Sequence, residues 1–499
     1  MKNYLLGIDI GTSSIKATAI DGQARTVAAA SAGYHLREDQ PGWRQIDTGS
    51  MWNGIFGALS NLGQKIDLSQ VGAIGLSCLC PGLAAFDSTG AVLVDPIIYS
   101  DQRSAAEAKE ISQKVDSQTL FALAANLPMP GAMSATSMLW IKHHLPTLYL
   151  RTFCFGHINT LLAVELTGNF AIDRSNASYT LLFDTAGTLT WSQELCRQIG
   201  IPLDKLPPIL SSAEPVGPLR RGPVTALGLT PGIPVIIGGG DTACAALACG
   251  VVRDGDVCES IGTTDVLTVC TSRPVFRREF INRCHVADGT WIYQGAMSHI
   301  GSSLSWCRDV LCPDLCQGMD TDPFDVLTDR AGRLSCPGAN GVVFLPYMMG
   351  ERSPVWDPKA RGVFFGLSLN STRDDLVRAV LESSGYGLRQ MMALAQEITG
   401  HKITAFSAIG GGSRSDIWGQ IKADITGADI AALQVKDMAP VGAALLAGVG
   451  SGVFSDVFDA ASRVRREVRT TFFSRPGEEA YDRRFHTYLQ LYPSLKSLY

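Results

Sequence analysis

The first residues that could do chemistry stand near the N-terminus, where a carboxylate is followed by a glycine turn. Asp9 lies at the end of an apolar strand, and Gly11 and Thr12 open the turn to a second, alternating strand. Glycine lets the backbone approach a ligand closely, and successive N–H groups in such a turn can bind phosphate oxygens. A neighbouring aspartate could hold a hydrated Mg²⁺. The same residues would also suit an ordinary β-hairpin.

A second turn of this kind lies about half the chain length further on. Gly262, Thr263 and Thr264 again follow an apolar strand and precede a β-branched run, although no carboxylate stands before the glycine. Alone, this segment predicts an ordinary turn. Together, the two turns predict a duplicated chain in which one phosphate-binding hairpin opens each half. No repeat of shorter period is present.

Two further glycine-rich segments follow predicted strands. Three consecutive glycines at 238–240 precede Asp241 and a predicted helix at 242–249. Asp241 could be a helix N-cap, or a general base at a strand end that faces a cleft. Three consecutive glycines are more than a helix N-cap requires. They are typical of a stretch of backbone that a ligand must approach closely. Residues 410–412 are also glycines and precede a predicted helix, a turn that can pack against a planar base or a phosphate.

Other catalytic patterns are weak or absent in the sequence. The Gly-Glu-Arg-Ser-Pro segment at 350–354 is typical of a solvated turn or of a salt bridge between domains. The chain has no P-loop, no complete dinucleotide-binding fingerprint, no nucleophile elbow and no His-Glu-x-x-His pair. The cysteine spacings match no four-ligand zinc pattern, so we expect the 13 cysteines to be reduced, mostly buried thiols.

The elements that must position these motifs alternate between strands and helices, which favours layered α/β domains. Further strands are predicted at residues 71–76, 83–86, 341–346 and 403–409. Helices are predicted at residues 51–65, 105–115, 135–144, 376–399 and 416–426. Gly400 is a suitable C-cap for the longest of them. We place a domain boundary near Gly250, which gives domains at 1–249 and 250–499.

Composition excludes several classes of protein. The 499 residues are 46% hydrophobic and 18% charged, with a net charge of -5, so the chain is neither disordered nor basic enough to predict nucleic-acid binding. No uncharged apolar run is long enough for a transmembrane helix. Asp9 would interrupt the apolar stretch of a signal peptide. We therefore expect a cytoplasmic protein.

With these motifs in order, the chain resembles the FGGY family of carbohydrate kinases, most of all its xylulokinase branch. The resemblance runs from about Tyr4 to about Gly448. It rests on the segments GIDIGTSSIK, SDQR, MPG, GGGD, SIGTT, FLPYMMGERSP, RGVFFGLSL, IGGGSRSDIW and APVGAALLAG. It implies an α/β fold with two actin-like (ribonuclease H-like) ATPase domains and a cleft between them that binds ATP and sugar.

The resemblance also implies roles for individual residues. Asp241 matches the catalytic base, and Asp9 would bind Mg²⁺ through water. The nucleotide-binding positions would be Gly11, Thr12, Ser13, Lys16, Gly262, Thr263, Thr264, Gly301, Ser305, Gly411, Gly412 and Asp416. Lys16 would otherwise be an ordinary exposed strand lysine.

The sugar side departs from the xylulokinase pattern. The usual Gln-Met-His is replaced by Leu79, Cys80 and Pro81, and Asp-Asn after the triple glycine is replaced by Asp241 and Thr242. The Trp-Asn-Asp-Gly-Arg stretch reads Tyr-Ser-Asp-Gln-Arg at 99–103, and the Lys-Asp-Tyr-Leu stretch reads Asn-Thr-Leu-Leu at 159–162. The candidate substrate contacts are Leu79, Cys80, Pro81, Tyr99, Asp101, Arg103, Asp241 and Thr242.

We therefore predict ATP- and Mg²⁺-dependent phosphorylation of a sugar or polyol hydroxyl, with a pentulose such as D-xylulose as the first candidate. Gluconate, ribulose, erythritol or a similar acceptor is the alternative, because a pocket without its hydrogen-bonding groups should reject a polyol that needs them. An actin- or chaperone-like ATPase acting on protein partners and a degenerate binding protein are further alternatives. The resemblance implies a homodimer, and we expect no nucleic-acid or membrane partner.

Overall fold

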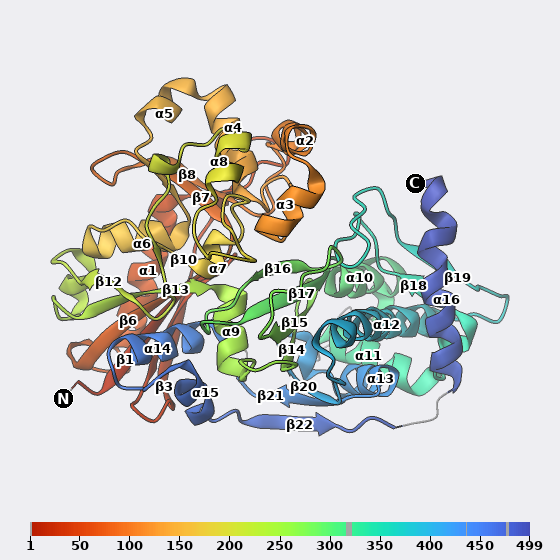
Figure 1. Cartoon of the computed structure of the whole chain (residues 1–499). Coiled ribbons are helices and arrows are strands. Elements are labelled where there is room, and N and C mark those ends of the chain that lie inside the picture. The colour runs from red at the N-terminus through yellow and green to blue at the C-terminus, as the bar shows by residue number, and fades with distance from the viewer. Residues whose placement is uncertain (1, 316–321, 436, 476–478) are drawn as a thin grey trace.

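The computed structural model of the chain describes residues 2–315, 322–435, 437–475 and 479–499. Two lobes carry the two halves of the chain, and a third group of elements lies on the first lobe, at the top of the view (Figure 1). No helix of the described residues is long and apolar enough to cross a membrane. Twelve cysteines fall within the described residues, and all of them are free thiols.

A six-stranded sheet forms the centre of the first half, in the order β12-β13-β6-β1-β2-β3. Its strands are β1 (Tyr4–Ile10), β2 (Ser14–Ile20), β3 (Thr26–Gly33), β6 (Val71–Cys78), β12 (Pro215–Pro218) and β13 (Pro234–Gly240). β1, β6 and β13 run parallel, and the other pairings are antiparallel. Buried apolar side chains of β1 and β6 share one hydrophobic core with α1 (Thr48–Gly63), which packs on β2 and β3, and with α6 (Ile158–Thr167), which packs on β6.

The second half repeats this plan with one additional strand, in the order β16-β17-β15-β14-β20-β21-β22. Its strands are β14 (Val257–Ile261), β15 (Asp265–Thr271), β16 (Ile281–Cys284), β17 (Trp291–Met297), β20 (Ala405–Ile409), β21 (Asp429–Leu433) and β22 (Val468–Phe472). β14, β20 and β21 are parallel, as β1, β6 and β13 are. Both predicted hairpins are therefore present, and the shared strand order agrees with a duplication.

The helices of the second half are α10 (Ile300–Trp306), α11 (Pro323–Leu334), α12 (Arg373–Thr399), α13 (Asp416–Thr426) and α16 (Glu479–Leu495). Of these, α12 and α13 pack on the second sheet, α11 packs on α12 and α13, and α16 packs on the separate strand β18 (Val343–Leu345). α12 begins three residues earlier than predicted, because Thr372 and Asp375 form a reciprocal capping box. It ends at Gly400, whose positive φ of 73° makes it the expected C-cap.

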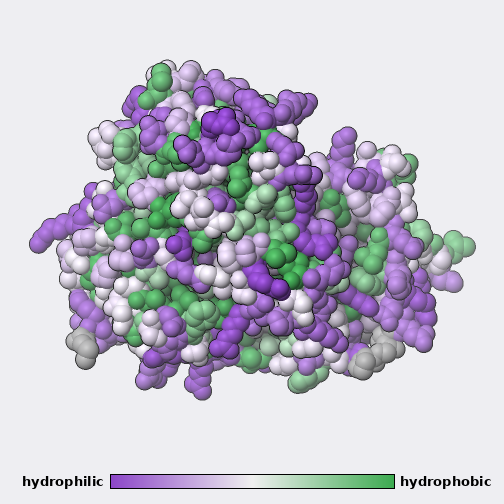
Figure 2. Space-filling model, viewed as in Figure 1, coloured by the Kyte–Doolittle hydropathy of each residue, from purple (hydrophilic) through white to green (hydrophobic). Residues whose placement is uncertain are grey.

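A smaller lobe inserted into the first half contains a sheet in the order β4-β5-β8-β7-β9. Its strands are β4 (Leu36–Arg37), β5 (Gln45–Ile46), β7 (Gly82–Phe86), β8 (Val92–Ile98) and β9 (Cys154–Gly156). The accompanying helices are α2 (Ala105–Lys114), α3 (Ser117–Ala124), α4 (Ser134–His144), α5 (Pro146–Arg151) and α8 (Gln193–Ile199). Hydrophilic residues cover much of the molecular face in view, and its outline is notched between the upper and right-hand lobes (Figure 2).

Helix α14 (Ala439–Gly450) joins the two halves, because it comes from the second half but packs on β1, β6 and the helix α9 (Asp241–Cys249) (Figure 1). Glycines make this approach possible. A Cβ at Gly7 would lie 1.8 Å from the carbonyl oxygen of Pro440, and one at Gly75 would lie 1.9 Å from that of Ala443. The division at 249/250 stays a prediction, and the structure adds that α14 contacts the first sheet.

A charged cluster lies inside the second half. Nζ of Lys422 on α13 lies 2.6 and 2.7 Å from the two carboxylate oxygens of Glu259 on β14, and both side chains are buried. Both carboxylate oxygens of Asp265 are also buried and have no hydrogen-bond partner within the part of the chain that the structure describes. Burial, and secondarily the charge of Glu259, raises the pKa of Asp265 well above its usual range. Burial therefore favours the protonated form of Asp265, while Lys422 pairs with Glu259.

We expect Lys422→Met to lower the free energy of unfolding by about 3–5 kcal/mol, because Glu259 would remain buried without its partner. The double variant Glu259→Leu/Lys422→Leu should recover most of this loss, since it removes both charges. Urea denaturation of the three proteins measures the effect. A single variant as stable as the wild type would show that the ion pair does not neutralise Glu259.

Candidate active site

Two hairpin turns present exposed backbone at corresponding places in the two sheets. The turn between β1 and β2 is closed by a hydrogen bond from the Gly11 N–H to the Ser14 carbonyl oxygen (3.1 Å), and the turn between β14 and β15 by one from Gly262 to Thr264 (2.8 Å). The turn residues Thr12, Ser13, Gly262 and Thr263 are exposed. The Gly262 N–H is used within its own turn, so the accessible N–H groups that a phosphate site requires can come from Thr12, Ser13 and Thr263.

Asp9 places a buried carboxylate beside the first turn. Its Oδ1 accepts a hydrogen bond from the Ser77 hydroxyl on β6 (2.7 Å), and its Oδ2 lies 4.0 Å from Nζ of Lys16. Lys16 also pairs with the exposed Asp437 at 2.8 Å, so it is not an isolated strand lysine. Burial, together with the negative charge of Asp241, raises the pKa of Asp9 to about 7.

Asp241 is the first residue of α9, and Gly240 is its N-cap, so the interpretation of Asp241 as the capping residue is wrong. Its Oδ1 accepts hydrogen bonds from the backbone N–H of Thr242 (2.7 Å) and from the Thr242 hydroxyl (3.1 Å). Oδ2 accepts none from the residues that the structure describes. Burial raises the pKa of Asp241, and the positive charge of Arg283 opposes that rise.

Asp9 and Asp241 fit a divalent cation. They lie at the carboxyl ends of β1 and β13, which flank β6 in the sheet and run parallel to it, and ligands of open α/β sheets bind at this edge. The charge of Asp241 raises the pKa of Asp9, so a cation near both would relieve their repulsion. Carboxylate oxygens are ligands that Mg²⁺ prefers.

Two glycine-containing segments pack against the second turn. A Cβ at Gly301, near the start of α10, would lie 1.9 Å from the Gly262 carbonyl oxygen, and the Gly301 N–H donates to the Thr263 carbonyl at 3.1 Å. In the loop after β20, Gly410 has a φ of +95°, and a Cβ there would lie 2.3 Å from the carbonyl oxygen of Ile261. The structure thus brings the segments that contain the predicted Gly301, Gly411 and Gly412 to one hairpin.

Two other predicted nucleotide contacts already have protein partners. The Ser305 hydroxyl donates to the Gly301 carbonyl oxygen at 3.1 Å, within α10. Asp416 begins α13 and pairs with Arg469 on β22 at 2.8 Å. Their roles toward a nucleotide stay predictions.

The predicted acceptor residues divide into two groups. Leu79 is buried, and Cys80 and Pro81 follow it directly after β6. The Pro81 carbonyl oxygen accepts the Tyr99 N–H at 3.0 Å, and the Tyr99 hydroxyl lies 3.5 Å from that of Thr12. These residues, with Thr242, therefore lie along the edge that carries Asp241 and the first turn.

Asp101 and Arg103 form the second group, a buried ion pair at 2.8 Å. The guanidinium carbon of Arg103 lies 4.0 Å from the ring centre of Trp43 and 5.1 Å from that of Trp140. Arg103 and both rings line a groove of about 550 Å³ on the inserted lobe. The polar atoms of this pair already bind protein, so their contact with a sugar stays a prediction.

Three buried polar residues near these strands were not predicted. Nδ1 of His157 donates to the side-chain oxygen of Asn176 (3.2 Å), Nε2 shares a hydrogen bond with the Ser134 hydroxyl (3.0 Å), and burial lowers the pKa of His157 to about 4. Asp173 accepts hydrogen bonds from its neighbours in the chain. Arg283, on β16 of the second half, is 1% exposed. An arginine within the short strand Ile-Asn-Arg-Cys is the only sequence signal that could have identified it.

Glu351 is buried, so the expectation of a solvated turn at 350–354 is wrong for this residue. It is 4% exposed, and its Oε1 accepts N–H groups from Ser298 (2.8 Å) and Arg352 (2.7 Å). Its Oε2 has no hydrogen-bond partner among the described residues. Burial raises the pKa of Glu351 to about 7. This carboxyl group anchors the segment that leads from β17 into α10.

We expect Glu351→Gln to change how stability depends on pH. Between the usual pKa of 4.5 and about 7, native Glu351 keeps a proton that the unfolded chain releases, so its contribution to stability falls as pH rises, by up to ~3 kcal/mol. Glutamine retains the accepting oxygen without titrating. Relative to the wild type, the variant should gain stability from pH 5 to pH 7 in denaturation curves. Equal slopes would contradict a raised pKa, and the exposed Glu479→Gln is the control.

Known proteins match this arrangement over most of the chain. The N-terminal domain of the FGGY family of carbohydrate kinases matches residues 4–248, and the C-terminal domain of that family matches residues 258–451. The chain belongs to the FGGY family. It is therefore an ATP-dependent carbohydrate kinase, built from two actin-like α/β domains, as the sequence predicts.

The relatives of this FGGY kinase differ in the acceptor that their names give. The chain is 28% identical to a xylulose kinase of Bacillus subtilis (strain 168), over 99% of this chain and 98% of the relative. It is 26% identical to a gluconokinase of the same organism, over 100% of this chain and 96% of the relative. The crystal structure of a xylulose kinase from Rhodospirillum rubrum superposes with a TM-score of 0.90, at 29% identity and 99% coverage of both chains.

Proposed function

We propose that this kinase transfers the γ-phosphoryl group of Mg²⁺-bound ATP to a hydroxyl group of a small sugar or polyhydroxy acceptor, with Asp241 as the general base. The main supporting observation is the pair of carboxylates at one sheet edge, where Asp9 lies beside a phosphate-type turn and Asp241 keeps a free oxygen. The named relatives support two acceptors, D-xylulose and gluconate.

In the proposed reaction, Oδ2 of Asp241 accepts the proton of the attacking hydroxyl. A loose transition state needs little early deprotonation, so the base acts mainly by orienting the acceptor in line with the γ-phosphorus. The Thr242 donors hold Oδ1 and thereby fix the direction of Oδ2. The oxygen of the attacking hydroxyl forms the new bond to the γ-phosphorus. The bond between the γ-phosphorus and the β–γ bridging oxygen breaks, and ADP leaves.

The remaining predicted residues would bind the nucleotide and its metal. Asp9 would hold Mg²⁺ through water, and the metal would supply positive charge to the phosphates. Lys16 and the N–H groups of the two turns would stabilise charge on the transferred group. The nucleotide would be held by the turn residues Gly11, Thr12, Ser13, Gly262, Thr263 and Thr264, together with Gly301, Ser305, Gly411, Gly412 and Asp416. A homodimer and a cytoplasmic location remain part of this proposal.

Acceptor-dependent release of ADP tests the proposal. The purified protein is given ATP and Mg²⁺ with each member of a panel of ketoses, alditols and sugar acids. We expect one class of compound to raise ADP release at least about 100-fold over the background with water, because the acceptor completes the site. Equal release with and without every acceptor would instead favour an ATPase that acts on protein partners.

A further inference from the structure

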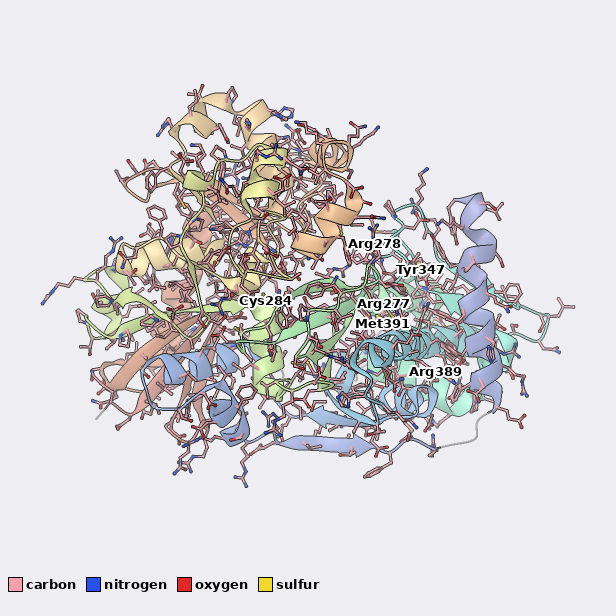
Figure 3. The ribbon with its side chains drawn as sticks, in the orientation of Figure 1. Arg277, Arg278, Cys284, Tyr347, Arg389 and Met391 are labelled. Carbon is pink, nitrogen blue, oxygen red and sulfur yellow. The ribbon has the colours of Figure 1, made fainter. Side chains whose placement is uncertain are left out.

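Arg283 is a buried cation, and two of its donor atoms have no hydrogen-bond partner among the described residues. It lies in β16, and its chain neighbour Cys284 lies where the second sheet meets the first half (Figure 3). The side chain is 1% exposed, and Nε and Nη2 are buried without a hydrogen-bond partner among the described residues. An arginine cannot become neutral in a protein, so these buried donors need an acceptor.

The guanidinium faces the acceptor end of the proposed active site. A Cβ at Gly240 would lie 3.0 Å from Nη1 and 3.1 Å from Nη2 of Arg283, and 3.3 Å from Cβ of Cys80. Gly240 directly precedes Asp241, and Cys80 is one of the predicted acceptor contacts. The absence of a side chain at position 240 is therefore what lets the guanidinium reach the end of β13.

The described groups around Arg283 leave Nε and Nη2 without a hydrogen-bond partner, although Tyr179 interacts with the guanidinium. The ring centre of Tyr179 lies 5.1 Å from the guanidinium carbon, and the Tyr179 hydroxyl donates to Gln294 at 2.8 Å. The buried carboxylate of Asp173 accepts instead from Asn159 (2.8 Å), Ser175 (2.7 Å) and Asn176 (2.6 Å). Among the described residues no acceptor reaches Nε and Nη2, so these two donors remain available to a bound ligand.

We propose that Arg283 binds a carboxylate on the acceptor substrate, so that the acceptor is a polyhydroxy acid of the aldonate class. This inference rests on the proposed function, and it makes Arg283 the residue that determines specificity. A guanidinium presents donors in a planar fork that matches the two oxygens of a carboxylate. A hydroxyl of a neutral sugar would accept one of these hydrogen bonds and leave the other donor unpaired, with the nearby Asp241 as the main opposing charge.

The carboxylate takes no part in the chemistry. It fixes one end of the acceptor at Arg283, while a hydroxyl further along the carbon chain lies at Asp241 and attacks the γ-phosphorus. The proton goes to Asp241 and ADP is the leaving group, as for any other acceptor. Replacement of the arginine should therefore affect acids far more than neutral polyols.

The test compares D-gluconate with D-glucitol and D-xylonate with xylitol, pairs that differ in the carboxylate, and includes D-xylulose. In the wild type we expect kcat/KM for the acid to exceed that for its alditol at least 100-fold. Arg283→Met should lower kcat/KM at least 100-fold for the acid, mainly through KM, and less than threefold for the alditol. Arg283→Lys should recover part of the loss. The exposed Arg278→Met, in the loop before β16, is the matched control.

The outcomes separate the two proposals. ADP release with D-xylulose or alditols but not with acids would overturn the carboxylate assignment and leave the kinase proposal standing. An equal loss of kcat for acids and neutral acceptors in Arg283→Met would also overturn it, because Arg283 would then act by positioning Asp241. If no acceptor of the panel raises ADP release above the background, both proposals are overturned. If Arg283→Met does not fold, the ratio of kcat/KM between each acid and its alditol in the wild type still decides whether the acceptor is an acid.

Discussion

Asp241→Asn should lower acceptor-dependent kcat by about 10²–10⁴-fold, the range that a positioned general base contributes. Asparagine is nearly isosteric and can keep the hydrogen bonds from Thr242 to one oxygen. It cannot take the proton of the attacking hydroxyl, so KM for ATP should change little while kcat falls. The measurement is steady-state ADP release with the best acceptor of the panel.

A matched control removes a carboxylate charge at another helix start. Asp456 caps α15 (Val457–Arg463) by accepting the N–H of Asp459 at 2.8 Å, and asparagine is an equally good cap. Asp456→Asn should therefore retain wild-type kcat. If Asp241→Asn also retains full acceptor-dependent activity, Asp241 is not the base.

Gly301→Ala should separate α10 from the turn between β14 and β15, the second proposed phosphate turn. Its Cβ would lie 1.9 Å from the Gly262 carbonyl oxygen, and this neighbour is backbone that no side-chain rotation can move. We expect ATP affinity to fall at least about tenfold, and the free energy of unfolding to fall by about 1–3 kcal/mol, because the turn and the helix can no longer be in contact. Calorimetric titration with ATP and urea denaturation measure the two effects.

Gly33→Ala provides the comparison for this glycine. A Cβ at Gly33 meets no heavy atom within 4 Å, so the added methyl group should leave ATP affinity unchanged. Wild-type affinity in Gly301→Ala would contradict the proposed contribution of α10 and the second turn to the nucleotide site.

Local patterns in the sequence predict much of the fold. The hairpins follow from apolar strands around glycine turns, and α12 follows from its amphipathic period and from Gly400. The inserted sheet was not predicted as a unit, because several of its strands have only two or three residues. The packing of α14 on the first sheet was also missed, since it depends on glycines of three distant segments.

The residues of the candidate site also divide into those that the sequence could identify and those that it could not. Asp9 and Asp241 could be identified because each stands beside the glycines that make its backbone accessible. Arg283 and Glu351 could not, because their importance comes from burial next to segments far away in the sequence. Lys422 is a similar case. A lysine in a helix is normally exposed, and its partner Glu259 lies far away in the sequence, on strand β14.

The most direct test of the central claim is ³¹P NMR of the products formed from ATP, Mg²⁺ and the best acceptor. We predict one phosphomonoester of the acceptor, formed in an amount equal to ADP by the wild type and lost in Asp241→Asn. Inorganic phosphate as the only product besides ADP, at the same rate in both proteins, would contradict transfer to an acceptor hydroxyl at Asp241.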